Sequence, residues 1–238
     1  MKRPDAEPRP DRRGAALDLV ILIAAAFLLI TVFGTGRAVI GGSAYLKALF
    51  LSRTVTLLLI ATWLLHRGGR GWRDVGLRTP PLWRSVAVVP IGLVAIGTAV
   101  AMAKMLLARA GYPYADYSAF HPLRGNIIEY LFWLIPVTVG SAAFGEEMIF
   151  RGFLLDAFRR VLGRGHWATL LAIVLQATVF SLVHAYQGVG GVVTTGIVGL
   201  LLGVTWLVSG KNLWPGIIIH ALLDGSAMTA VFLGLPMG

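Results

Sequence analysis

The chain has 238 residues, of which 57% are hydrophobic and only 13% are charged. Soluble domains carry about 25% charged residues, so this composition excludes an ordinary soluble protein. The formal net charge is +10. Cysteine is absent, and this absence excludes disulfides, thiolate metal sites and cysteine nucleophiles. No basic stretch is interleaved with aromatic residues in a way that suggests a base-stacking surface, so nucleic acid is not an expected partner.

The first 14 residues, MKRPDAEPRPDRRG, precede the first apolar run. They are rich in proline and arginine, so we expect a disordered basic cytoplasmic tail at 1–14 and an integral membrane domain at 15–238. A cleaved signal peptide is the alternative. The apolar run lacks a clear small-x-small cleavage site, which favours an uncleaved first span.

The apolar residues form continuous runs near the length of roughly 20 residues that spans a bilayer. The predicted fold class is therefore all-α, a polytopic membrane helical bundle with about seven transmembrane helices, or eight if the longest run is divided. That run is too long for one crossing, and we expect its end to extend into the cytoplasm. The predicted spans are 17–33, 44–65, 85–109, 126–162, 166–184, 192–209 and 213–235.

Basic residues are distributed unequally between the two sides of this predicted bundle. Fourteen lie in the tail and in the links after the second, fourth and sixth spans, whereas four lie in the other links. Because Lys and Arg accumulate in cytoplasmic links, the N-terminus is predicted to be cytoplasmic, in a bacterial plasma membrane. The fourteen are Lys2, Arg3, Arg9, Arg12, Arg13, Arg67, Arg70, Arg73, Arg78, Arg84, Arg159, Arg160, Arg164 and Lys211, and the four are Arg37, Lys47, Arg109 and Arg124.

Two adjacent carboxylates and an arginine interrupt the fourth span, in the stretch AFGEEMIFRGF at 143–153. An acid at the bilayer centre costs about 2.5–3.5 kcal/mol on insertion scales, so such residues are functional by default. Glu147 and Arg151 are four residues apart, share a helix face and can pair. Glu146 points about 100° away from Glu147, which leaves its carboxylate for another partner. The alternative to a functional role is that the two acids lie at the membrane interface, in the headgroup zone.

Two later spans carry histidines. His184 lies as far after the GRG turn as Glu146 lies before it, so in an antiparallel hairpin the two residues stand at the same height and can meet. Phe180 shares a face with His184, and His220 shares a face with Asp224 in the last span. Packing alone is the simpler interpretation of a histidine in a span.

A Glu–His–His–Asp set is suited to activating water. A carboxylate and an imidazole that share a water form a general-base pair, and a second histidine with a carboxyl group can steady a developing oxyanion. The same side chains are ligands that a divalent metal such as zinc accepts, so the residues leave metal-dependent and metal-free hydrolysis open. Such groups also relay protons in transporters, although no inverted repeat is visible.

Three motifs follow in order: EEMIFR at 146–151, FSLVH at 180–184 and HALLD at 220–224. They resemble the E-E-x-x-x-R, F-x-x-x-H and H-x-x-x-N/D motifs of the CAAX-protease and bacteriocin-processing (CPBP/Abi) family of intramembrane proteases. The resemblance covers about 126–235, the expected protease core. It implies an endopeptidase that hydrolyses a peptide bond with an activated water, at a pocket reached from the cytoplasmic leaflet.

The resemblance also implies roles for the individual residues. The prenyl-protein proteases carry Asn where this chain has Asp224, and an ionised Asp opposes an oxyanion. The implied partners are a peptide or protein substrate, which need not be prenylated, and the lipid bilayer. The resemblance leaves metal dependence open; a divalent metal such as zinc, if one binds, is held by residues among Glu146, His184, His220 and Asp224. The alternative is a non-catalytic bacteriocin-immunity protein or membrane scaffold. The catalytic candidates are Glu146, His184, His220 and Asp224, with Glu147, Arg151 and Phe180 as supporting residues.

Overall fold

The computed structural model describes residues 11–37, 43–79, 82–112, 118–163 and 165–235, and every regular element within these ranges is helical. The predicted all-α class is confirmed. The elements are α1 (Arg12–Arg37), α2 (Ser43–Arg67), α3 (Leu82–Arg109), η1 (Ser118–Leu123), α4 (Ile127–Phe132), η2 (Trp133–Leu154), α5 (Leu155–Leu162), α6 (His166–Leu182), η3 (Ala185–Gln187), α7 (Gly188–Val208) and α8 (Trp214–Phe232).

The long helices follow the predicted spans. Because α4, η2 and α5 succeed one another without a break, residues 127–162 form one helix, here called the long helix. With it, the described ranges contain seven long helices, as the apolar runs predict. α1 begins at Arg12, inside the segment 1–14 for which a disordered tail is expected, and residues 1–10 of that segment lie outside the described ranges.

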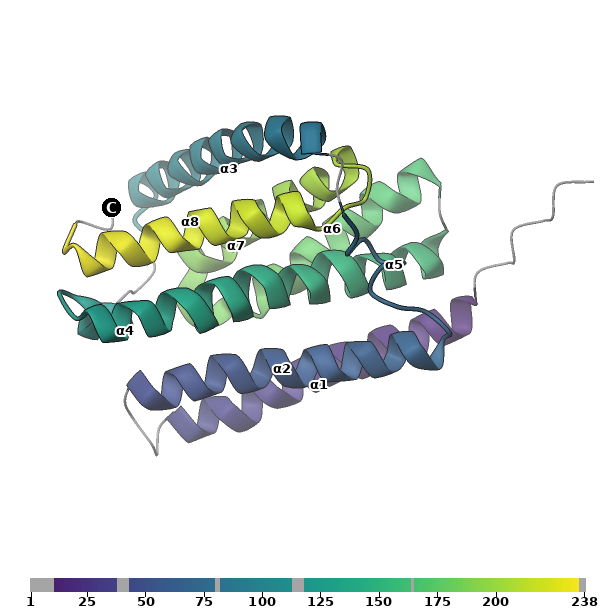
Figure 1. Cartoon of the computed structure of the whole chain (residues 1–238), viewed down its shortest axis with the longest axis horizontal. Helices are drawn as coiled ribbons and strands as arrows, with labels where there is room; N and C mark the ends of the chain where they lie inside the picture. The colour runs from purple at the N-terminus through teal and green to yellow at the C-terminus, as the bar shows by residue number, and fades with distance from the viewer. Residues whose placement is uncertain (1–10, 38–42, 80–81, 113–117, 164, 236–238) are drawn as a thin grey trace, which may run out of the picture.

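Successive long helices run in opposite directions, so the bundle has two ends (Figure 1). One end, here called the basic end, contains the start of α1, the link 68–79, the turn between α5 and α6, and the link 209–213. The opposite end, here called the far end, contains η1, η3 and the C-terminal end of α8 (Figure 1). The links with most of the arginines therefore share one end, which is the arrangement on which the predicted orientation depends.

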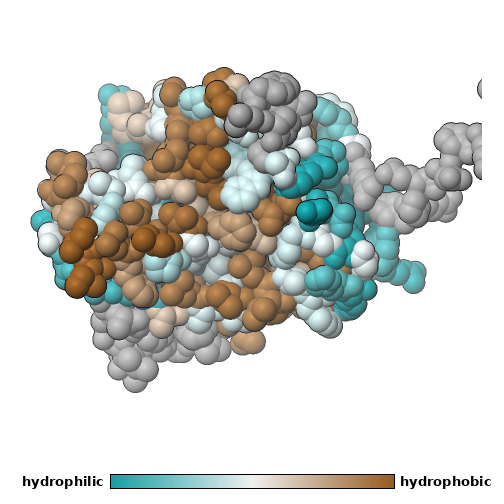
Figure 2. Space-filling view, in the orientation of Figure 1, coloured by the Kyte–Doolittle hydropathy of each residue, from teal (hydrophilic) through white to brown (hydrophobic). Residues whose placement is uncertain are grey.

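Apolar side chains cover the outside of the bundle between its two ends. On the face shown in Figure 2, hydrophobic residues occupy the middle and hydrophilic residues gather at the basic end. Leu59, Ile91 and Val94 are among the large apolar residues that are exposed. Five of the described helices are long and apolar enough to cross a membrane. A belt of this kind is expected to face lipid, and the chain is an integral membrane protein.

The middle of the long helix, η2, has the wider turn of a π-helix, with hydrogen bonds from residue i to i+5. The sequence pattern predicts an ordinary α-helix here. Pro136 lies in this segment and lacks the N–H that an α-helical ladder needs. π turns are rare and frequently occur at functional sites, and this one contains both Glu146 and Glu147.

Glycines bring α6 and α7 into close contact, because small residues four apart on one helix let a second helix approach closely. A Cβ atom at Gly203 would come within 2.7 Å of Cγ2 of Ile173, and one at Gly199 would come within 3.3 Å of the α6 backbone. The buried Gln176 amide also donates a hydrogen bond of 2.9 Å to the carbonyl oxygen of Gly199. This contact fixes the end of α6, where His184 follows.

The interior of the basic end is filled by apolar side chains. Phe153, Leu154 and Leu155 of the long helix are fully buried. They belong to apolar clusters that include residues of α1, α2 and α6 on one side and Trp206 and Leu213 on the other. Close packing of this kind leaves few voids that hold even one water molecule.

Two carboxylates also bind the helices together at the basic end. Asp18 of α1 accepts hydrogen bonds from Arg67 at 2.7 Å and from Arg160 at 3.0 Å. Asp156 accepts one from Arg160 at 3.1 Å and pairs with Arg70 at 2.7 Å. We call these five residues the basic-end ion cluster. Each carboxylate in it has two cationic partners.

Candidate active site

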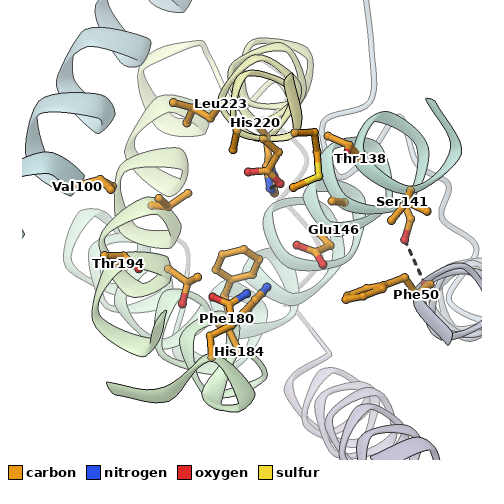
Figure 3. A pocket seen from close by; sticks show the side chains of 18 of the residues that line it. Phe50, Val100, Thr138, Ser141, Glu146, Phe180, His184, Thr194, His220 and Leu223 are labelled. Atoms are coloured by element: carbon orange, nitrogen blue, oxygen red, sulfur yellow. Dashed lines mark hydrogen bonds and ion pairs between the residues drawn. The ribbon is translucent and has the colours of Figure 1, made fainter. Parts of the chain in front are cut away.

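A cavity of about 340 Å³ lies among α3, η2, α6, α7 and α8 (Figure 3). The four predicted catalytic residues and Phe180 all line it, although they come from three separate helices and lie far apart in the sequence. Glu147 and Arg151 are buried behind its wall and do not line it. The residues of the three motifs that face the cavity are Glu146, Phe180, His184, His220 and Asp224.

Glu146 points its carboxylate from η2 into the cavity (Figure 3). Among the described residues, its ion-pair partner is Arg53 of α2, whose Nη2 lies 3.9 Å from Oε1. That distance is too long for a hydrogen bond, so the carboxylate keeps its acceptor positions for a water or a substrate. Gly145 allows α2 to come this close, because a Cβ atom there would come within 2.3 Å of Cγ2 of Thr54.

The neighbouring Glu147 is engaged through one of its carboxylate oxygens. Its Oε1 accepts hydrogen bonds from Arg151 Nη1 at 2.8 Å and from His220 Nδ1 at 3.0 Å. Glu147 is 1% exposed and Arg151 is 0% exposed. The predicted pair of Glu147 with Arg151 is confirmed, whereas the bond to His220 was not predicted. This shared carboxylate connects η2 to α8.

Phe180 lies between the buried arginine and the cavity. The Arg151 guanidinium stacks over the Phe180 ring at 4.4 Å from its centroid. Among the described residues, Nε and Nη2 of this arginine have no hydrogen-bond partner, and a cation over an aromatic face is stabilised most when both are removed from water. The ring also packs against His184, at 4.7 Å between centroids, and against Phe150, at 4.9 Å.

The structure fixes the tautomer of His184. Its Nδ1 lies 2.7 Å from the backbone carbonyl oxygen of Phe180. A carbonyl oxygen only accepts hydrogen bonds, so Nδ1 carries the hydrogen and Nε2 of the neutral ring is an acceptor. His184 is buried and lines the same cavity as Glu146, which is the juxtaposition that the hairpin geometry predicts.

His220 faces a carboxylate at each ring nitrogen. Its Nδ1 bonds to Glu147, and its Nε2 lies 3.3 Å from Oδ2 of Asp224, whose side chain is 45% exposed. Two carboxylate acceptors call for two N–H donors, so this arrangement favours the imidazolium form of the ring. A positive ring at the cavity wall is suited to stabilising a negative charge that develops beside it.

Gly216 makes the contact between α8 and Glu147 possible. It lies one helical turn before His220, and a Cβ atom at this position would come within 2.9 Å of Oε2 of Glu147. Without a side chain here, the backbone of α8 approaches the carboxylate closely enough for the His220 bond to form.

The side chains as they lie do not fit a catalytic metal. Within the described ranges, no three His, Asp or Glu side chains form a group that could hold a metal ion. Both nitrogens of His220 face carboxylates, and Nδ1 of His184 is used by a backbone carbonyl oxygen. One of the four imidazole nitrogens, Nε2 of His184, therefore remains for a ligand, and the carboxylates of Glu146 and Asp224 do not lie where they would complete the three-ligand set that a catalytic zinc takes.

Several residues of the site were not predicted from the sequence. Arg53 could have been noticed, because a charged residue inside a predicted span indicates function. Tyr186 and Gln187 line the cavity from η3, and no sequence pattern identifies them. Lys104 of α3 also lines the cavity, although its place near the end of a span predicts only snorkelling.

The fold and the site together define a class: an integral membrane helical bundle in which a free carboxylate and two histidines meet in a buried cavity. A family model described as type II CAAX prenyl endopeptidase Rce1-like matches residues 128–226, which include all three motifs. This match confirms the resemblance over that part of the chain. It supports a membrane peptidase in general. No significant match was found among curated proteins or solved structures.

Proposed function

We propose that the protein is an intramembrane endopeptidase that hydrolyses a peptide bond with a water activated by Glu146 and His184. The observation that carries this proposal is the unequal use of two adjacent acids. Glu147 has both a guanidinium and an imidazole within 3.0 Å, whereas Glu146 faces the cavity with its cation 3.9 Å away. A buried carboxylate left without a hydrogen-bond donor is costly, and a substrate water supplies one.

In the first step, a water lies between the two cavity residues. Nε2 of His184 accepts one of its hydrogens, and the Glu146 carboxylate takes the proton as the water oxygen attacks the carbonyl carbon of the peptide bond. General-base catalysis of this kind contributes about 10²–10⁴-fold in rate. Arg53 acts through Glu146, since its positive charge lies 3.9 Å from the carboxylate and attracts it.

In the second step, the carbonyl oxygen becomes negative and His220 stabilises it. The imidazolium shares its Nε2 hydrogen between Asp224 and the new oxyanion. Glu146 then returns its proton to the leaving nitrogen as the C–N bond breaks, which restores the carboxylate. No covalent intermediate with the enzyme forms, and the products are one carboxylic acid and one amine.

The two carboxylate partners of His220 hold this ring in place. Glu147 and Asp224 carry two negative charges, and Arg151 and the His220 imidazolium carry two positive charges, so the four together are neutral. Neutralising buried charges in this way limits their desolvation cost. We propose that Glu147 and Arg151 position His220 and do not touch the substrate.

Apolar side chains provide the rest of the binding surface. Phe50, Phe120 and Trp133 line the cavity together with aliphatic residues of α3 and α7. Such a surface suits the apolar side chains of a peptide or protein substrate on either side of the cleaved bond. Lipid-exposed helices around the cavity favour a substrate that is itself associated with the membrane.

The proposal is tested by mapping new peptide termini in cells. Wild-type protein and the Glu146→Gln variant are expressed at equal levels, and the N-terminal peptides of the membrane proteome are compared. The proposal predicts termini that appear with wild type and disappear with Glu146→Gln. The matched control is Glu129→Gln, because Glu129 pairs with Lys47 outside the cavity; it should give the wild-type set. Identical termini from wild type and Glu146→Gln would favour the non-catalytic immunity or scaffold role.

A chelator tests the metal-free form of the mechanism. Because the donor set does not fit a metal, we expect turnover by purified protein to be unchanged after chelator treatment. The measurement is cleavage of one of the mapped peptides before and after treatment. Loss of turnover that added zinc restores would show that the site rearranges to bind metal.

A further inference from the structure

We propose that the cavity opens to the extracytoplasmic side of the membrane and takes its substrate there, as a peptide segment of an exported or membrane-anchored protein. The substrate assignment rests on the proposed peptidase function, whereas the direction of access does not. It replaces the expectation of a pocket reached from the cytoplasmic leaflet. Three independent observations lead to it: where the cavity lies along each helix, what closes its other side, and which end of the bundle is basic.

The cavity lies in the far half of the bundle. In α3 its lining residues run from Ile96 to Lys104, toward the end of that helix at Arg109. In α8 they run from His220 to Met228, toward the end at Phe232. The connections of the far end also contribute, with Phe120 of η1 and Tyr186 and Gln187 of η3. Among the described residues, none of the basic-end links lines it.

The side of the cavity that faces the basic end is closed. Along the long helix, Glu146 is followed by the fully buried Glu147 and Arg151, and then by buried apolar residues of the basic end. The basic-end ion cluster follows, joining α1, the end of α2 and α5. A peptide entering from this end would have to break a buried charge pair and a packed core, which costs several kcal/mol for the pair alone.

The distribution of basic residues indicates which side of the membrane each end of the bundle faces. The basic end has the start of α1 and links rich in arginine, such as Arg67, Arg70 and Arg73, whereas the links at the far end have few basic residues. Short links rich in Lys and Arg stay in the cytoplasm. The closed end is therefore cytoplasmic, and the half that holds the cavity faces the extracytoplasmic side.

The absence of cysteine from the sequence makes a direct test possible. Single cysteines are introduced into the full chain at three positions, and intact spheroplasts are treated with a membrane-impermeant maleimide. Gly97→Cys probes the cavity, because Gly97 lines it and a Cβ atom there meets nothing within 4 Å. Ala110→Cys marks the far end, and Gly71→Cys, where a Cβ atom also meets nothing, marks the basic end.

The proposal predicts that Gly97→Cys and Ala110→Cys are labelled in intact spheroplasts and that Gly71→Cys is labelled only after permeabilisation. Labelling of Gly97→Cys only after permeabilisation, or failure to label it in either condition, would overturn the direction of access. Labelling of Gly71→Cys in intact spheroplasts would overturn the orientation.

These readouts do not depend on proteolysis. If the labelling pattern holds but Glu146→Gln leaves all peptide termini unchanged, the direction of access stands and the peptidase proposal fails. If both hold, the termini that require Glu146 should lie in extracytoplasmic segments. Termini confined to cytoplasmic segments would contradict the substrate assignment.

Discussion

The two halves of the bundle use the same kinds of charged residues in different ways. In the basic-end ion cluster, Asp18 and Asp156 each have two guanidinium partners within 3.1 Å. In the cavity half, Glu146 has one cationic partner among the described residues, at 3.9 Å. Buried charges with complete sets of partners brace the helices. A buried carboxylate with fewer hydrogen-bond and ion-pair partners is available to act on a water or a substrate. The surrounding side chains determine which reaction it can catalyse.

The same contrast separates two residues that are neighbours in the chain. Glu147 bonds to Arg151 and His220 and lies behind the cavity wall, whereas Glu146 lines the cavity. An acid with hydrogen-bond partners, Glu147, and an acid that faces the cavity, Glu146, are thus adjacent in the helix. Substitutions at each kind of site should therefore have different effects: loss of activity in the cavity, and loss of stability where the partners are complete.

The largest expected effect on activity is at His184. His184→Gln removes the Nε2 acceptor that orients the water, so we expect turnover to fall by about 10²–10⁴-fold with little change in thermal stability. Kinetics of the purified variant on a mapped peptide, with a melting curve, measure both. His66→Gln is the matched control, because His66 is exposed at the end of α2. A His184→Gln variant as active as this control would remove His184 from the mechanism.

The largest expected effect on stability is at Arg151. Arg151→Met leaves Glu147 with His220 as its partner in a fully buried position, and removing one partner of a buried pair costs about 3–5 kcal/mol. Arg160→Met is the comparison, since Asp18 keeps Arg67 and Asp156 keeps Arg70; the loss of its hydrogen bonds should cost less, about 1.5–3 kcal/mol. Unfolding in detergent measures both. Equal losses would contradict the view that complete partner sets protect the basic end.

A smaller effect is expected at Arg53. Because Arg53 acts through Glu146, Arg53→Gln should lower kcat about tenfold, which corresponds to about 1.4 kcal/mol, and should leave KM unchanged. Arg53→Lys keeps the charge and should recover most of the rate. In a Glu146→Gln background, Arg53→Gln should have no further effect on turnover. A rise in KM with unchanged kcat would instead show that Arg53 contacts the substrate.

The sequence predicts the bundle well because the signals for it are local. Runs of apolar residues set the helices, and the bias of basic residues between links separates the two ends. The sequence also predicts that Glu146 and His184 share a cavity, because equal distances from a short turn determine height in a hairpin. Both residues line the cavity in the structure, as the hairpin argument predicts.

Contacts that depend on how helices rotate and pack against each other were not predicted. The bond between His220 and Glu147 requires the close approach that Gly216 allows, and the position of Arg53 requires α2 to pack against η2 at Gly145. Neither follows from spacing along one helix. The π-helical turns of η2 also change the directions in which its side chains point, and the periodicity of an α-helix does not predict these directions.

The central claim is that the carboxylate of Glu146, which faces the cavity, is the base. It is tested most directly by the turnover of purified Glu146→Gln and Glu129→Gln in lipid nanodiscs, on one mapped peptide and beside wild type. We expect Glu129→Gln to match wild type and Glu146→Gln to lose turnover by about 10²–10⁴-fold while it melts at a temperature close to that of wild type. Full turnover by a correctly folded Glu146→Gln variant would contradict the account.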